Sequence, residues 1–154
     1  GQVVFEDLAS TVLDHASTPQ VELVIQPDQG WVYTGIPTVG YFTITNTTTE
    51  GVFGGLPAHL EWFATGFDVV FEPGAPPVHT DHAGASWPDH AVEYTYNSEG
   101  DFTPEATVTW GVEITIAGIT QTYQHVRQTH ITYPQPIHTK IGKAHLTTNP
   151  WETH

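Results

Sequence analysis

The sequence predicts an all-β protein of antiparallel strands with one short helix at its start. From Val21 onward, β-branched and aromatic residues alternate with polar ones, and this period of two is typical of strands with one packed and one solvated face. The chain also contains 14 glycines and 12 prolines in 154 residues, a composition that suits many short strands joined by tight turns. Together these observations favour an antiparallel sandwich.

The first segment differs from the rest, because its apolar residues fall at helical spacing. They are Phe5, Leu8, Ala9, Val12 and Leu13. The following Ser17-Thr18-Pro19 predicts the end of this amphipathic helix. The helix is expected either to dock against the sheet or to bind a partner. The predicted organisation is therefore a helical segment over residues 1–20, one β domain over 21–146 and a tail over 147–154.

Nine strands follow from the period of two and from the turn residues that bound them. The clearest pair is a hairpin that turns at Ala117-Gly118-Ile119. The longest stretch without a strand pattern runs from residue 72 to 90, and a loop of that length is typically functional or mobile. The predicted strands are Val21–Ile25, Trp31–Tyr33, Val39–Asn46, Leu60–Phe63, Asp68–Glu72, Ala91–Tyr96, Glu105–Ile116, Thr120–Thr132 and Ile141–Leu146.

The charge is strongly acidic, with 17 Asp and Glu against three Lys and Arg and a formal net charge of -14. Nucleic-acid binding and docking on anionic lipid are excluded, because both depend on clustered cations. The acidity either attracts cations and basic partners or serves solubility alone. No apolar run approaches the roughly 20 residues that a membrane-spanning helix needs, so membrane insertion is not expected.

The residues that the chain lacks set further limits. Cysteine is absent, which excludes disulfides, thiolate metal sites and cysteine nucleophiles. Methionine is absent too, so Gly1-Gln2 is interpreted as an end made by processing or by cloning. Asn46-Thr47-Thr48 is a formal glycosylation triplet, although such triplets also occur by chance.

Several segments carry a resemblance to a known family. Residues 93–110 begin with Glu-Tyr-Thr-Tyr and end with Thr-Val-Thr-Trp. Between these two runs lie a turn that contains Gly100 and an aromatic residue. A second segment, Leu60-Glu61-Trp62-Phe63, is a predicted strand that contains a Trp. Together with Leu23-Val24-Ile25-Gln26-Pro27 and Trp87-Pro88-Asp89-His90, this order of parts resembles PKD domains of secreted actinobacterial surface proteins. One departure is Ala64-Thr65-Gly66-Phe67-Asp68, which stands where that family has Phe-Gly-Asp-Gly.

The resemblance implies an immunoglobulin-like β-sandwich, localisation outside the cell or at its surface, and contacts with proteins or polysaccharide. It implies no catalytic residues. We therefore expect a structural or binding module and not an enzyme.

Histidines and carboxylates in the long loop are candidate metal ligands. They are His79, Asp81, His82, Asp89 and His90, residue types that suit zinc, nickel or copper. Calcium is a second possibility, with oxygen ligands from turns at Asp81, Asp89, Glu99 and Asp101. No fixed metal motif is present, so the alternative is that these side chains only hydrogen-bond loop backbone. No cofactor is otherwise expected, and Gly-x-Ser-x-Gly is absent.

Tryptophans are the stronger candidates for binding. Trp31, Trp87 and Trp151 fall in loops or near ends, where an exposed indole stacks on a sugar or fills a partner's cavity. Trp62 and Trp110 are predicted to be in the core. A protein partner or self-assembly through β edges is the first hypothesis, and a carbohydrate-binding module with coplanar Trp and Tyr is the second. A metal-dependent enzyme using the His and Asp loop is the third.

Overall fold

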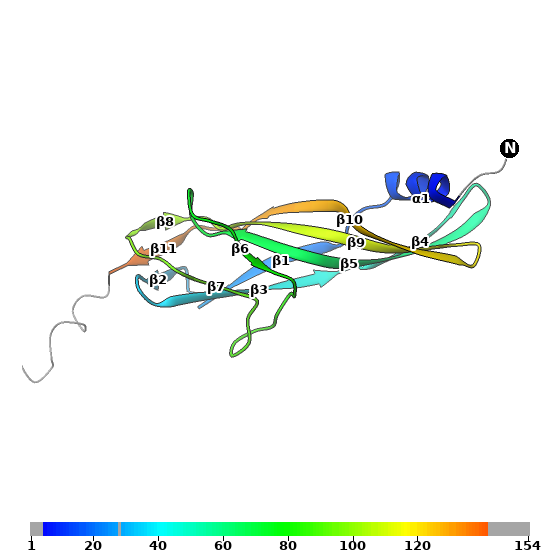
Figure 1. The fold of residues 1–154 in the computed structure, drawn as a ribbon. Coiled ribbons are helices and arrows are strands. Elements are labelled where there is room, and N and C mark those ends of the chain that lie inside the picture. Colours follow the sequence, from blue (N-terminus) through cyan, green and yellow to red (C-terminus); the bar gives the residue numbers. More distant parts are fainter. Residues whose placement is uncertain (1–4, 28, 142–154) are drawn as a thin grey trace, which may run out of the picture.

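The described residues form mainly β-strands, with one short helix near the start of the chain (Figure 1). The computed structural model describes residues 5–27 and 29–141. The elements are α1 (Phe5–Asp14), β1 (Gln20–Gln26), β2 (Trp31–Tyr33), β3 (Pro37–Thr45), β4 (Thr48–Phe53), β5 (Leu56–Val70), β6 (Val78–Thr80), β7 (Val92–Thr95), β8 (Gly100–Phe102), β9 (Glu105–Ile116), β10 (Ile119–Thr132) and β11 (Ile137–Lys140).

The largest sheet has the strand order β10-β9-β5-β4, and β6 pairs with β5 beside it. All of these pairings are antiparallel. The predicted hairpin is confirmed: Ile119 pairs with Ile116 across a turn at Ala117 and Gly118. Both turn residues have positive φ, 51° and 83°, which matches the twist of the two strands.

Two smaller sheets complete the architecture. β1, β3 and β7 form an antiparallel sheet in the order β1-β3-β7. At one end of the molecule, β11 lies between β2 and β8, parallel to β2 and antiparallel to β8. A strand near the start of the chain is thereby joined to the last described strand.

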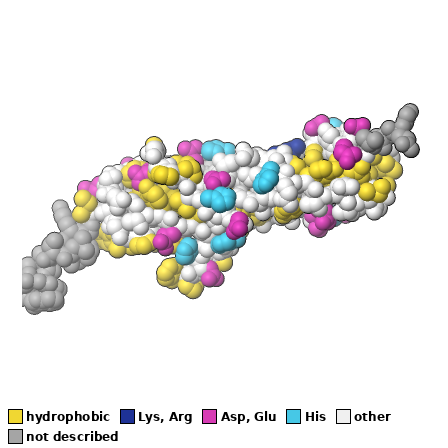
Figure 2. Space-filling view, in the orientation of Figure 1, with side chains coloured by type: hydrophobic (Ala, Val, Ile, Leu, Met, Phe, Trp, Pro, Cys, Tyr) yellow, Lys and Arg dark blue, Asp and Glu magenta, His cyan; other side chains and the backbone are white. Residues whose placement is uncertain are grey.

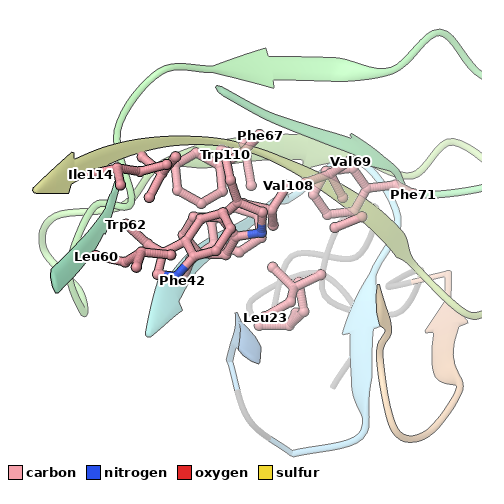
Figure 3. Packing of buried hydrophobic residues seen from close by; sticks show 14 of the residues in the cluster. Leu23, Phe42, Leu60, Trp62, Phe67, Val69, Phe71, Val108, Trp110 and Ile114 are labelled. Atoms are coloured by element: carbon pink, nitrogen blue, oxygen red, sulfur yellow. The ribbon is translucent and has the colours of Figure 1, made fainter. Parts of the chain in front are cut away.

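The core lies between the large sheet and the β1-β3-β7 sheet (Figure 3). Phe42 of β3 stacks on Phe67 of β5, with ring centroids 4.4 Å apart. Trp62 and Trp110 are both buried, as predicted. Trp110 also donates a hydrogen bond from Nε1 to the hydroxyl of Thr129 at 2.8 Å, so its polar atom is satisfied inside the protein.

The helix α1 docks on this core, which confirms the first of the two expectations for it. Ala9 and Val12 are buried in the core cluster. The guanidinium of Arg127 donates hydrogen bonds to the carbonyl oxygens of Leu13 and Ala16, each at 2.8 Å. A cation at a helix C-terminus complements the helix dipole. No helix within the described residues is long and apolar enough to cross a membrane.

Several expected boundaries were wrong. The strands predicted at Leu60–Phe63 and Asp68–Glu72 are one continuous strand, β5, which passes through an irregularity between Ala64 and Gly66 instead of a turn. The short strands β4, β6 and β8 were not predicted. The last strand is Ile137–Lys140, and Ile141 lies outside it; the rest of the predicted strand Ile141–Leu146 falls outside the described residues.

Candidate binding site

The long loop between β6 and β7 presents one tryptophan to solvent. The loop leaves the body of the molecule as a protrusion (Figure 1) and is fixed to β3 at both of its ends. The backbone N–H of Phe42 donates to the carbonyl of Ala83, and that of Ala91 donates to the carbonyl of Gly40, both at 2.8 Å. Trp87, within this loop, keeps 68% of its surface exposed.

Further contacts fix the backbone around Trp87. The N–H of Asp89 donates to the carbonyl of Ser86 at 3.0 Å and closes a turn. The N–H of Trp87 donates to Oε1 of Gln26 at 2.8 Å. An exposed indole on a backbone held in this way loses little conformational entropy when it binds a partner.

The floor beside Trp87 is a row of three residues across the β1-β3-β7 sheet. Val39 of β3 lies opposite Gln26 on one side and opposite Glu93 on the other. Because directly opposed residues share a face of a sheet, these side chains form one surface. The hollow above it has a volume of about 520 Å³ and is lined by Gln26, Pro27, Ile36, Pro37, Val39, Trp87 and Glu93.

The strand that carries Glu93 is anchored from its other face. Tyr94 stacks on Phe71, with ring centroids 4.9 Å apart and an interplanar angle of 3°, and donates a hydrogen bond to Glu72 at 2.5 Å. This hydrogen bond, together with partial burial, raises the pKa of Tyr94 to about 12. Since side chains alternate along a strand, Tyr94 holds β7 against the core while Glu93 points to the hollow.

The hollow is mostly apolar and carries a single carboxylate. Glu93 is the one ionisable side chain among its described lining residues. Nε2 of His90 lies 4.0 Å from Oε1 of Glu93, while its Nδ1 is buried without a hydrogen-bond partner among the described residues. In Figure 2 the protrusion shows hydrophobic, acidic and histidine side chains and no Lys or Arg.

The other two candidate tryptophans are placed differently. Trp31 lies on β2 and is only partly exposed, with Nζ of Lys140 4.5 Å from its ring centroid. Its ring meets that of Tyr33 at 75°, so the two rings do not form the coplanar surface on which sugars stack. Trp151 lies outside the described residues.

The five candidate metal ligands have other neighbours. Nδ1 of His79 lies 2.8 Å from Oδ1 of Asp68, a residue that was not among the candidates, and His90 lies beside Glu93. Asp81, His82 and Asp89 are exposed. Of the calcium candidates, Asp101 is paired with His138. In the part of the chain that the structure describes, no three His, Asp or Glu side chains are grouped so that they could hold a metal ion.

Of the seven residues that line the hollow, six were not predicted as functional, Pro27 and Val39 among them. Gln26, Ile36, Pro37 and Glu93 belong to three different strands or their flanks, and no local pattern marks them as neighbours of Trp87. The nearest signal in the sequence is Gln26-Pro27, because proline has no N–H to donate to a β-ladder and therefore indicates that the strand ends at Gln26.

Comparison of the chain with models of protein families, with curated proteins and with solved structures finds no match. The resemblance to PKD domains therefore remains a hypothesis based on the motifs quoted above.

Proposed function

We propose that this protein is a non-catalytic binding domain that meets a partner protein through the exposed indole of Trp87 and the apolar hollow beside it. The observation that carries the proposal is an exposed tryptophan on an anchored backbone, next to a hollow of about 520 Å³. Exposed large apolar residues around a concave surface mark interaction sites. Tryptophan also contributes strongly to the binding free energy of protein interfaces.

We also propose that the fold is an immunoglobulin-like, PKD-like sandwich. The strand order supports this: β1-β3-β7 corresponds to strands A-B-E, and β6-β5-β9-β10 corresponds to C′-C-F-G, since β6 follows β5 in the chain and pairs with it. β4, which precedes β5, is an addition to this pattern. The buried Trp62 then falls on the strand equivalent to C, which carries the core tryptophan of immunoglobulin domains. Domains of this architecture commonly serve in contacts at cell surfaces, so we propose a location outside the cell or at its surface.

Binding to a protein is favoured over binding to polysaccharide by the aromatic geometry. Trp87 has no second aromatic among the described residues that line its hollow, whereas a sugar-binding face uses several coplanar rings. The lining is also mainly aliphatic and prolyl, which suits apolar side chains of a peptide. The same lining holds one carboxylate and no described nucleophile beside a base, which supports a role without catalysis.

A selection from a random displayed-peptide library tests the proposal. The wild-type protein is the bait, and the selected peptides are then measured against Trp87→Ala without any counter-selection. Selected peptides are expected to bind the wild type with a Kd measurable by calorimetry and to bind Trp87→Ala at least ~10-fold more weakly. Ile36→Ala is expected to weaken binding as well, because Ile36 lines the hollow and is 55% exposed.

The matched control is Ile119→Ala, which truncates an isoleucine of equal exposure, 55%, at the β9-β10 turn. This variant should bind the selected peptides like the wild type. Peptides that bind all three variants equally would overturn the proposal. Binding of a neutral oligosaccharide that depends on Trp87, with no peptide selected, would favour the carbohydrate-binding alternative.

A further inference from the structure

The hollow combines an apolar lining with a carboxylate and contains no described cation. Glu93 shares a row with the buried Val39, so a bound apolar group would take water away from this carboxylate. A carboxylate that loses water without gaining a cation or a hydrogen-bond donor destabilises the complex. A ligand that fills this hollow therefore has to provide a positive charge or a strong donor at Glu93.

The surroundings of the hollow add to the negative field. Residues 81–93 contain Asp81, Asp89 and Glu93 and no Lys or Arg, and the whole chain has a formal net charge of -14. Such a field attracts cations and repels anionic ligands.

Among the described residues, His90 comes nearest to Glu93, but its Nε2 lies 4.0 Å from Oε1 of Glu93, too far for a hydrogen bond. The two described Lys and Arg side chains are engaged elsewhere. Arg127 is bonded to the carbonyl oxygens at the end of α1, and Lys140 lies over the ring of Trp31. The third Lys or Arg of the chain, Lys143, lies outside the described residues. A positive charge for Glu93 is therefore best supplied by a different molecule.

We propose that the hollow binds an arginine side chain of the partner protein, with its aliphatic stem on Ile36 and Pro37, its guanidinium plane against the Trp87 indole, and its N–H groups directed to Glu93. This inference rests on the proposed function, because it assigns the chemistry of the partner at the same site. Arginine fits better than lysine, since a planar and weakly hydrated guanidinium stacks on an aromatic face while it donates to a carboxylate.

A set of short peptides with one variable position tests the inference. The probe is an acetylated and amidated Gly-Leu-X-Leu-Gly peptide in which X is arginine, lysine, citrulline or alanine. Citrulline keeps the shape and most donors of arginine and lacks its charge. Binding is followed by the shift of the Trp87 indole N–H signal in two-dimensional NMR, assigned with Trp87→Ala, at about 20 mM and about 500 mM NaCl.

We expect the arginine peptide to bind the wild type most tightly, followed by lysine, with citrulline and alanine weaker by roughly 3- to 10-fold or more. Glu93→Gln should reduce affinity for the arginine peptide by a similar factor and remove its advantage over citrulline. Glu113→Gln is the matched control, because it removes one exposed carboxylate from β9 of the large sheet and should leave that preference unchanged. High salt should weaken binding of the arginine peptide more than binding of the citrulline peptide.

The outcomes separate this inference from the function on which it rests. If arginine and citrulline peptides bind equally and both depend on Trp87, the charge recognition is wrong and the apolar binding site stands. If Glu93→Gln and Glu113→Gln weaken binding of the arginine peptide equally, only the overall negative charge of the protein attracts the peptide, and the inference is wrong. If no peptide shifts the Trp87 signal, the inference is wrong, and the library selection decides independently on the proposed function.

Discussion

Gly84 lies against Ala91 across the base of the Trp87 loop, so closely that a Cβ at position 84 would be 2.6 Å from the backbone nitrogen of Ala91. That nitrogen donates the hydrogen bond that ties the loop to Gly40. The residue at position 84 also has a φ of 73°, which favours glycine. The presentation of Trp87 thus depends on a residue with no side chain.

Gly84→Ala is expected to destabilise the protein by roughly 2 kcal/mol or more, because both the backbone conformation and the contact oppose a methyl group. Gly74→Ala is the matched control: Gly74 has a φ of 84° and nothing within 4 Å of its Cβ position, so it should cost only about 1 kcal/mol. Urea unfolding measures both values. Equal losses in the two variants would show that the contact with Ala91 does not matter.

Arg127→Ala is expected to release α1 from the sheet. The variant loses two hydrogen bonds to the end of the helix and the guanidinium that lies 5.7 Å from the ring centroid of Trp62, at a cost of about 2 to 4 kcal/mol. Unfolding curves and the helical circular dichroism signal report the change. Lys140→Ala, which removes an exposed cation from Trp31, should cost less than about 1 kcal/mol. Similar losses in both variants would contradict the assignment.

His59 makes stability depend on pH. Its Nδ1 lies 3.0 Å from Glu50 and its Nε2 lies 3.5 Å from Glu61, and these contacts, with Glu50 first, raise the pKa of His59 above 6.5. A pKa that is higher in the folded state stabilises the protein fully below the unfolded value and loses this effect as pH rises through the folded value. His59→Gln should therefore lower Tm more at about pH 6 than at about pH 8.

The exposed His82, which has no carboxylate within the described ion pairs, provides the comparison for this experiment. His82→Gln should change Tm little at either pH. A Tm loss for His59→Gln that is the same at both pH values would contradict the role of protonation.

Gly111 makes room for an aromatic ring. A Cβ there would lie 2.5 Å from two carbons of the Phe63 ring, so Gly111→Ala should cost about 1 to 3 kcal/mol through overpacking. Phe63→Leu in the same chain should recover part of this loss, because the smaller side chain removes the clash. A double-mutant cycle by urea unfolding measures the coupling energy between Gly111→Ala and Phe63→Leu. A coupling energy near zero would show that the Phe63 ring does not cause the loss.

Two buried threonines should respond in opposite ways to the same substitution. The hydroxyl of Thr38 is buried without a hydrogen-bond partner among the described residues, whereas that of Thr139 donates to the carbonyl of Ser98 at 2.7 Å. Thr38→Val should stabilise the protein by about 1 kcal/mol, and Thr139→Val should destabilise it by about 1 to 3 kcal/mol. Thermal unfolding of the two variants measures these changes in stability. Equal losses of stability in both variants would contradict the prediction.

Most long strands and the helix could be predicted from the sequence, whereas the short strands could not. β4 alternates exposed and half-buried residues and begins with three polar residues before Gly51, so its local signal is weak. β6 and β8 have three residues each, too few for a period to be visible. Their conformation follows from pairing with β5 and β11, which only the folded chain brings beside them.

The same limit applies to the candidate site. Trp87 could be selected because a large aromatic residue in a long polar loop is unusual. Its neighbours could not, since the N–H of Trp87 bonds to Gln26, 61 residues earlier in the chain. The candidate metal ligands are close in sequence, but the fold does not bring them together. His79, for example, pairs with Asp68 on the neighbouring strand.

By itself, the sequence determined that Val112, Ile114 and Ile116 of β9 face the core, where the β9-β10 hairpin turns and that α1 is amphipathic, because these properties depend on residues within a few positions of one another. Only the tertiary structure decided that β5 continues past Trp62, that Arg127 holds the end of α1, and that Glu93 shares a hollow with Trp87. Each of these depends on distant segments that meet when apolar faces are buried together, and no local period records which faces will meet.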